Sequence, residues 1–245
     1  MDRRKFVVGM GALASGAAAA MGTGAFTAAQ MSRQAYVDVV NDSSGLIAPV
    51  PGGGSASNAP PLGEDTDHVF EEDGELTIDL AAQTGAGEGV NVNSRYQIGA
   101  LFGYDDSLPT DVGNSPTTHS AFSVLNQSDS PRRIGLDFEF TGDGPNVDGS
   151  KIIFQARPGP DNAVDGGEAT QTLVKEMEVN GNQPSGSIFY GPGAAGGSRD
   201  DRIISGGRLG VSILIDTTGS EADSSEDLSG QLTVYADDAN SNLGQ

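Results

Sequence analysis

The chain has 245 residues, with 34 acidic against 13 basic side chains, a formal net charge of −21, and no cysteine. The lack of cysteine excludes disulfides, thiolate metal sites and a cysteine nucleophile, and the charge argues against nucleic acid and anionic lipid as partners. Such an acidic, lysine-poor composition predicts a protein that works in concentrated brine, where the Debye length falls to about 3 Å at 1 M salt; a generic acidic secreted protein is the alternative.

Residues 1–29 have the pattern of an export signal, because a basic start is followed by small apolar residues. The order Arg3, Arg4, Lys5, Phe6 indicates the twin-arginine route, with an ordinary secretory signal or a retained tether as alternatives. The apolar part is rich in glycine and alanine, so we expect no stable membrane insertion after signal removal. The sequence therefore predicts an exported protein, extracellular or at the cell surface.

Residues 30–61 combine a short β-rich run with a flexible segment. The segment at 51–61 is rich in glycine, proline and serine and has no residues that would pack in a core. It is either a surface loop of one domain or a hinge that lets the preceding strand leave its own domain. The β-rich run, our candidate donor strand, consists of Tyr36, Val37, Asp38, Val39 and Val40.

Residues 62–245 carry the pattern of one β-sandwich domain. The clearest stretch is 119–141, where Ile134, Leu136 and Phe138 alternate with polar residues or glycine. A cluster of Asn, Ser and Asp before Pro131 supplies turn chemistry. We therefore expect a long hairpin over 119–141 at the centre of the domain.

Further strands are expected along the rest of the chain. Residues 95–104 fit an extended or single-turn element, and no convincing helix follows the signal. The pattern predicts an all-β fold, specifically a single jelly-roll-like β-sandwich. The other β-rich runs lie at 35–40, 68–70, 75–80, 151–156, 171–179, 187–190, 208–216 and 228–236.

Motifs for catalysis are lacking in the sequence. No serine lies in a Gly-x-Ser-x-Gly motif, and the two histidines, His68 and His119, have no sequence partner for nucleophilic catalysis or a zinc site. Carboxylate pairs of the glycosidase kind would arise by chance among 34 acids. We therefore expect a protein that is not an enzyme and that needs no cofactor.

A modification site and a cation site stay open. Asn126 begins an Asn-x-Ser acceptor sequence for N-glycosylation. The loop carboxylates Asp105, Asp106, Asp143 and Asp148 could bind a hard cation together with backbone carbonyls. A solvated acidic surface is the alternative for these four side chains.

Several stretches together resemble one group of proteins. They are the signal end at 22–27, the run at 36–39, the segment 123–128, the strand 134–140 and the final run 229–234. With these stretches the chain resembles secreted proteins of halophilic archaea that are distantly similar to the TasA/camelysin biofilm-fibre family. The resemblance spans nearly the whole chain after the signal.

The resemblance implies a jelly-roll subunit of a filament, in which the N-terminal strand of one subunit completes the sheet of the next. An open sheet edge can be satisfied in this way, and a head-to-tail contact that does not close yields a filament. Tyr36, Val37, Val39 and Val40 would then fill pockets and Asp38 would face solvent. Partners would be further copies of the chain or other cell-envelope proteins.

The alternative is a monomeric cell-surface binding domain for a ligand, a cation or an envelope protein. The run at 35–40 is then simply the first strand of its own sandwich.

Overall fold

The described part of the chain is all-β. In this computed structural model, residues 36–40, 46–52, 68–72, 75–79, 90–101, 120–159, 163–164, 174–192 and 200–237 are described, and they contain no helix. Their strands are β1 (Tyr36–Val40), β2 (Ile47–Pro51), β3 (Val69–Glu72), β4 (Glu75–Asp79), β5 (Arg95–Ile98), β6 (Phe122–Asn126), β7 (Arg133–Phe140), β8 (Lys151–Pro158), β9 (Lys175–Asn180), β10 (Ser185–Tyr190), β11 (Arg208–Asp216) and β12 (Gly230–Asp237).

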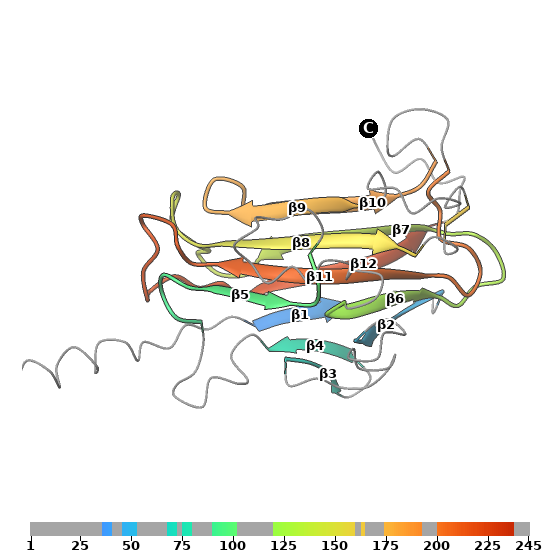
Figure 1. Ribbon diagram of the computed structural model, residues 1–245, viewed down its shortest axis with the longest axis horizontal. Helices are drawn as coiled ribbons and strands as arrows, with labels where there is room; N and C mark the ends of the chain where they lie inside the picture. Colours follow the sequence, from blue (N-terminus) through green and yellow to red (C-terminus); the bar gives the residue numbers. More distant parts are fainter. Residues whose placement is uncertain are drawn as a thin grey trace, which may run out of the picture.

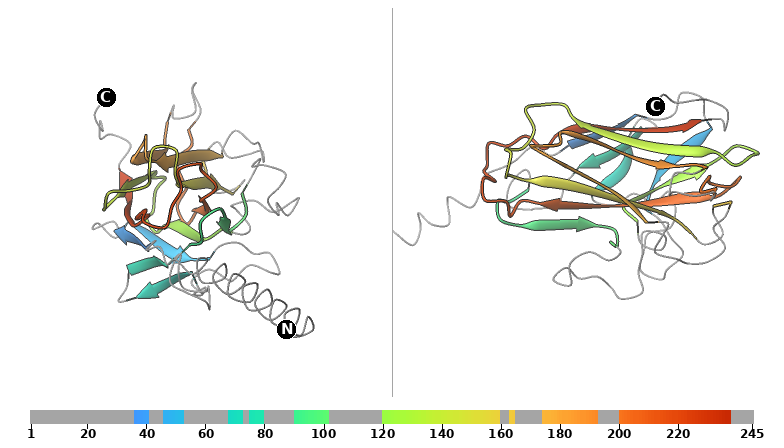
Figure 2. Two further views of the ribbon diagram at one scale, coloured as in Figure 1. Left: turned by 90° about the vertical axis from the view of Figure 1, so that its left-hand side faces the viewer. Right: turned by 90° about the horizontal axis from the view of Figure 1, so that it is seen from above.

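The strands form two sheets (Figure 1). The first sheet has the order β10-β7-β12-β1-β4-β3, and the second has the order β2-β6-β11-β8-β9, with β5 also paired to β11. Seen from above, the two sheets lie in two layers (Figure 2). Among the pairings of the described strands, the one between β1 and β12 is the single parallel pairing.

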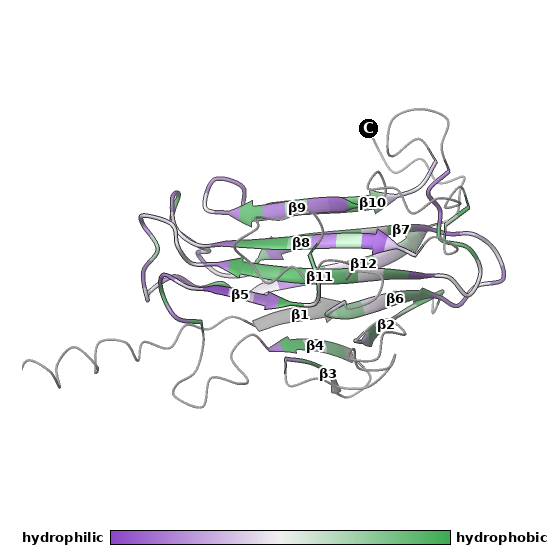
Figure 3. Ribbon diagram, in the orientation of Figure 1, coloured by the Kyte–Doolittle hydropathy of each residue, from purple (hydrophilic) through white to green (hydrophobic). Residues whose placement is uncertain are grey.

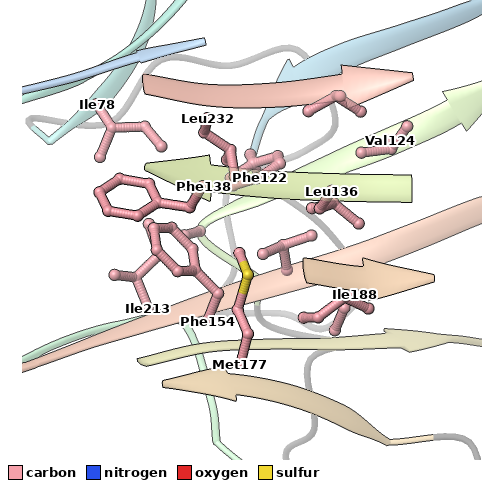
Figure 4. Packing of buried hydrophobic residues seen from close by; sticks show 14 of the residues in the cluster. Ile78, Phe122, Val124, Leu136, Phe138, Phe154, Met177, Ile188, Ile213 and Leu232 are labelled. Atoms are coloured by element: carbon pink, nitrogen blue, oxygen red, sulfur yellow. The ribbon is translucent and has the colours of Figure 1, made fainter. Parts of the chain in front are cut away.

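One hydrophobic core joins the two sheets. Phe138 of β7 and Phe154 of β8 come from different sheets, and their ring centroids lie 5.1 Å apart (Figure 4). Such an offset ring pair adds about 0.5–1.5 kcal/mol to the stabilisation from burial alone. The core therefore fixes the two layers against each other.

The alternation that the sequence predicted is confirmed in the long strands. Ile134, Leu136, Phe138 and Phe140 of β7 are all buried, while Asp137 and Glu139 between them are exposed. The same parity holds in β11, which is hydrophobic over most of its length (Figure 3). Leu214 on its other face joins Ile153 and Leu101 in a second, small cluster, so this strand is covered on both faces.

The expected hairpin over 119–141 is wrong. Its two halves, β6 and β7, belong to different sheets: β6 pairs with β2 and β11, and β7 pairs with β10 and β12. The physical reason is the bonding of Asn126, the last residue of β6. Its side-chain amide bonds carbonyls near residue 203, and this directs the chain from one layer to the other.

The N-terminal strands lie within the two sheets. We expected residues 62–245 to form the sandwich and 30–61 to supply an N-terminal strand and a linker, the strand being either a donor to another subunit or the first strand of its own sandwich. β1 is an inner strand of the first sheet, and β2 is paired to β6 in the second sheet. In this structure both sheets therefore contain residues from before residue 62, and residues 1–35 and 53–61 lie outside the described residues.

Candidate assembly interface

The candidate donor strand lies between two strands that meet only through it. β1 pairs with β12 on one side, from Val37↔Gly230 to Val40↔Thr233, and with β4 on the other, from Tyr36↔Asp79 to Asp38↔Thr77. We call the gap between β12 and β4, which β1 fills, the β1 slot (Figure 1). Without β1, the first sheet would divide into β10-β7-β12 and β4-β3.

The two strands that border the β1 slot, β12 and β4, differ in how they are paired to the rest of the first sheet. β12 is paired with β7 along its whole length, from Gly230↔Phe140 to Asp237↔Arg133. β4 is paired within the sheet to β1 and to the edge strand β3, so its link to the rest of that sheet runs through β1. A strand in this position therefore satisfies backbone N–H and C=O groups on two neighbours at once, and each such group is costly to leave unpaired.

The register divides the five candidate residues between the two faces of the sheet. Val37 is paired with Ile78 and Gly230, and Val39 is paired with Leu232. Ile78 and Leu232 are fully buried. Because paired residues in a pleated sheet share a face, Val37 and Val39 fall on the core side.

The other three residues of β1 fall on the opposite face. Tyr36 is paired with Asp79, Asp38 with Gln231, and Val40 with Thr233. We expected Tyr36 and Val40 to fill pockets beside Val37 and Val39. The register groups Tyr36 and Val40 with Asp38 on one face, since residues of one strand alternate between the two faces. The pocket-filling role stays a prediction.

Gly230 gives the β1 slot its shape. A Cβ at this position would overlap the ring of Phe138 and would lie 2.8 Å from the carbonyl oxygen of Glu139. The Phe138 ring thus occupies the space that a side chain at Gly230 would need. The glycine lets a large core side chain lie directly beside the backbone that pairs with Val37.

The chain between β1 and β2 is short. Five residues, 41–45, separate Val40 from the next described residue, Leu46. The carbonyl oxygen of Leu46 accepts a hydrogen bond from the backbone N–H of Gln127 at 2.9 Å, and Ile47 is buried. β2 is therefore anchored in the second sheet, and β1 precedes this anchor.

Asn126, the predicted glycosylation site, is fully buried. Its Nδ2 donates to the carbonyl oxygens of Ser130, Ile203 and Ile204 at 2.9, 2.9 and 3.0 Å. Its Oδ1 accepts from both the backbone N–H and the hydroxyl of Ser128. A glycan on Nδ2 is incompatible with this arrangement, because it would displace the carbonyls that the nitrogen bonds.

The other sequence candidates are not brought together into a site. His68 lies on the β3–β4 pair, with Nδ1 3.2 Å from the carbonyl oxygen of Asp79. Asp143 and Asp148 lie in the described segment 120–159, and no group of three or more His, Cys, Asp or Glu suited to a metal exists among the described residues. His119, Asp105 and Asp106 lie outside those residues.

Sequence reasoning missed a buried charged pair. Lys175, at the start of β9, has its Nζ 3.5 Å from Oδ2 of Asp201, and the side chains are 17% and 0% exposed. Beyond the export signal, lysines occur only at Lys151 and Lys175. That rarity was the one signal that could have drawn attention to this position.

In the part of the chain that the structure describes, no helix is long and apolar enough to cross a membrane. Comparisons of the chain with protein families, with curated proteins and with solved structures found no match.

Proposed function

We propose that this chain is a jelly-roll-like β-sandwich that serves as a structural subunit of an extracellular filament or biofilm matrix, assembled in high salt by strand complementation between subunits. The observation that carries the proposal is the position of β1. It is the first described strand, it is the parallel partner of β12, and it fills the gap between two strands, β12 and β4, that are joined in this sheet only through it. A copy of β1 from a neighbouring chain would satisfy the same two walls in the same register.

The short connection between β1 and β2 supports an exchange of β1 between subunits. If residues 41–45 extend, β1 leaves its own slot while β2 stays paired with β6. Each subunit then donates one strand and receives one, and such a head-to-tail contact propagates unless rotation closes it. The total of paired backbone groups is unchanged, so the equilibrium depends on protein concentration.

The surrounding features fit an exported protein. The twin-arginine pattern at residues 1–29 would export the subunit already folded, and the charge of −21 would keep subunits apart until salt screens it. The proposal includes no enzymatic activity, no cofactor, no nucleic acid and no stable insertion in a membrane after signal removal.

Deletion of residues 30–45 tests this function. We expect the truncated subunit to stop polymerising in molar salt and to bind a synthetic peptide that spans Ala35–Val40. A matched peptide with Asp at positions 37 and 39 should not bind, because both positions fall on the core face by register. A truncated protein that is a folded monomer and ignores both peptides contradicts strand exchange.

A second candidate function, a monomeric cell-surface binding domain, has an observation of its own. The first sheet is complete within one chain, since β1 occupies its own slot. In addition, an open groove of about 1000 Å³ runs beside β9, β10, β7 and β12. We call it the acidic groove, and its carboxylates are Asp137, Glu139, Glu176 and Glu178.

Electron microscopy in molar salt separates the two candidates, because the binding domain would appear as isolated particles at every protein concentration.

A further inference from the structure

Lys175 and Asp201 form a charged pair that is almost fully enclosed by the protein. Lys175 begins β9, and Asp201 lies on the segment that follows β10. Nζ and Oδ2 are 3.5 Å apart, and the carboxylate is 0% exposed. The amine nitrogen is therefore held against the carboxyl group of Asp201, and holding two reacting groups together in a fixed geometry removes much of the cost of bringing them together.

The amine of Lys175 is held by three neighbours. Nζ donates to the carbonyl oxygen of Phe189 at 2.6 Å and lies 4.4 Å from the ring centroid of Tyr190. The Tyr190 ring is itself fixed, because its hydroxyl donates to the carbonyl oxygen of Ala156 at 2.6 Å and the residue is fully buried. The ammonium group therefore has little freedom to turn away from Asp201.

The surroundings make the ammonium group of Lys175 easier to deprotonate. Burial lowers the pKa of Lys175, and the charge and hydrogen bonding of Asp201 raise it only in part. An amine without its proton is the nucleophilic form of lysine. A buried ion pair also gains less from its attraction than two solvated charges lose on burial, which favours the neutral form of the pair.

We propose that Lys175 and Asp201 condense to form an intramolecular isopeptide bond. The proton of the ammonium group passes to the carboxylate, and the Nζ lone pair then forms a bond to Cγ of Asp201. A proton from Nζ moves to the hydroxyl of the tetrahedral intermediate, the Cγ–O bond breaks, and one water leaves. The product is a secondary amide, and no oxidant or other reactant takes part.

Arg157 is placed to assist this step. It is buried. Burial is the main reason that the pKa of Tyr190 is raised; the charge of Asp201 adds to this rise and the charge of Arg157 opposes it, so both charges act on the same ring. Negative charge develops on the carboxyl oxygen when the amine attacks. A fixed cation nearby stabilises that charge most effectively where water is excluded.

The bond would tie β9 to the segment after β10 in a chain that has no cysteine. It would close a loop of about 27 residues and reduce the conformational freedom of the unfolded chain, as a disulfide does. Unlike an ion pair, an amide bond is not weakened by salt. This inference does not depend on the proposed filament, because it concerns a single chain.

Lys151 and Glu178 provide a matched pair for comparison. Their Nζ and Oε2 atoms are closer, at 2.9 Å, but the side chains are 31% and 39% exposed. Both side chains contact water, so the site lacks the enclosure that would favour attack of the amine on the carboxyl carbon. We expect this pair to remain an ordinary ion pair.

The test compares the masses of two variants, Lys175→Arg and Lys151→Arg, after folding in molar salt and dissolution in denaturant. The variants have the same composition, so their masses are equal if no bond forms, wherever the signal is cleaved. We expect Lys175→Arg to be heavier by the mass of one water, about 18 Da, because it alone cannot form the amide.

The wild-type protein gives an independent readout if Lys175→Arg does not fold. Its digest should contain a branched peptide in which Lys175 is joined to the peptide that holds Asp201. Equal masses of the two variants, or a wild-type digest in which Lys175 and Asp201 occur only in separate linear peptides, would overturn the proposal.

Discussion

The ring of Phe138 lies over the backbone of Gly230, in the space that a side chain on Gly230 would need. Gly230 is also the register partner of Val37, so this contact joins the main core to the wall of the β1 slot. A second contact between an aromatic ring and a glycine lies on the other face of the sheet, where the ring of Tyr235 covers its cross-strand partner Gly135. Aromatic rings thus fill the gaps that these two glycines leave in β12 and β7.

Replacing Gly230 with alanine should destabilise the fold by about 1–3 kcal/mol, because the added methyl overpacks a core that cannot yield. The measurement is denaturant unfolding in molar salt. Gly206→Ala is the control: φ is +69° there and no atom lies within 4 Å of the added carbon, so its cost of about 1 kcal/mol reflects only the backbone.

Phe138→Leu should relieve the Gly230→Ala variant. The double variant is then less destabilised than the sum of the two single changes by about 1 kcal/mol or more. If the free-energy changes of the two single variants simply add in the double variant, the ring of Phe138 does not occupy the space beside Gly230.

Changing Asn126 to aspartate should cost more than about 3 kcal/mol, because the carboxylate would face three carbonyl oxygens without the protons to bond them. Asn182→Asp is the control: the side chain of exposed Asn182 donates to the carbonyl oxygen of Val147, and the change should cost less than about 1 kcal/mol. Equal unfolding midpoints for the two variants would count against the bonding described for Asn126. Mass spectrometry of the exported protein should also find Asn126 without a glycan.

The pairing of Asp200 with Arg202 should make the free energy of unfolding depend on pH. The side-chain hydrogen bonds from Arg202 lower the pKa of Asp200, chiefly through a paired contact in which Nε and a terminal nitrogen both donate. The pair therefore stabilises the fold above the ordinary aspartate pKa of about 3.9, and this contribution disappears as the pH falls through the lower folded pKa. Asp200→Asn should lose about 1 kcal/mol at neutral pH, and this difference should shrink as the pH falls through the folded pKa of Asp200.

Asp137→Asn should behave in the opposite way. Although Asp137 is exposed as a residue, the partial burial of its carboxylate raises its pKa, against the smaller effect of the Tyr235 hydroxyl. Its charged form therefore disfavours folding, and the variant should gain a few tenths of a kcal/mol above about pH 4. If Asp200→Asn and Asp137→Asn change the free energy of unfolding in the same way at every pH, the environments of the two carboxylates do not differ.

Sequence patterns located the long strands because burial there alternates locally. In β9, Met177 and Val179 are buried as their shared parity predicted. The edge strand at 68–70 and the strand at 75–80 were also expected, and β3 and β4 occupy these places.

The features that the sequence did not reveal depend on contacts between residues that are far apart along the chain. Asn126 bonds to Ile203 and Ile204, 77 and 78 residues away, so its local setting among turn residues resembles a hairpin. The parallel pairing of β1 with β12 likewise joins the two ends of the described chain, and Lys175 meets Asp201 through the β9–β10 corner. No local periodicity reports contacts of this range.

Salt should stabilise the fold in part through the acidic groove. Its carboxylates repel one another most at low salt, where the Debye length is about 30 Å at 0.01 M. The double variant Glu139→Gln, Glu176→Gln should therefore melt at a higher temperature than the wild type in dilute buffer, with the difference shrinking in molar NaCl. Glu178→Gln should show no such gain, because Glu178 already pairs with Lys151 at 2.9 Å. Identical salt profiles for all three proteins would contradict this account.

Strand exchange itself can be measured with two single-cysteine variants, Asp38→Cys and Gln231→Cys, since the chain has no cysteine of its own and these residues are register partners. The variants are mixed, unfolded, returned together to molar salt and oxidised. If β1 occupies the slot of a neighbouring chain, the mixture contains disulfide-linked pairs of the two variants that neither variant forms alone. If the mixture stays uncrosslinked while a chain carrying both cysteines closes an internal disulfide as a monomer, β1 remains in its own slot and the filament proposal is wrong.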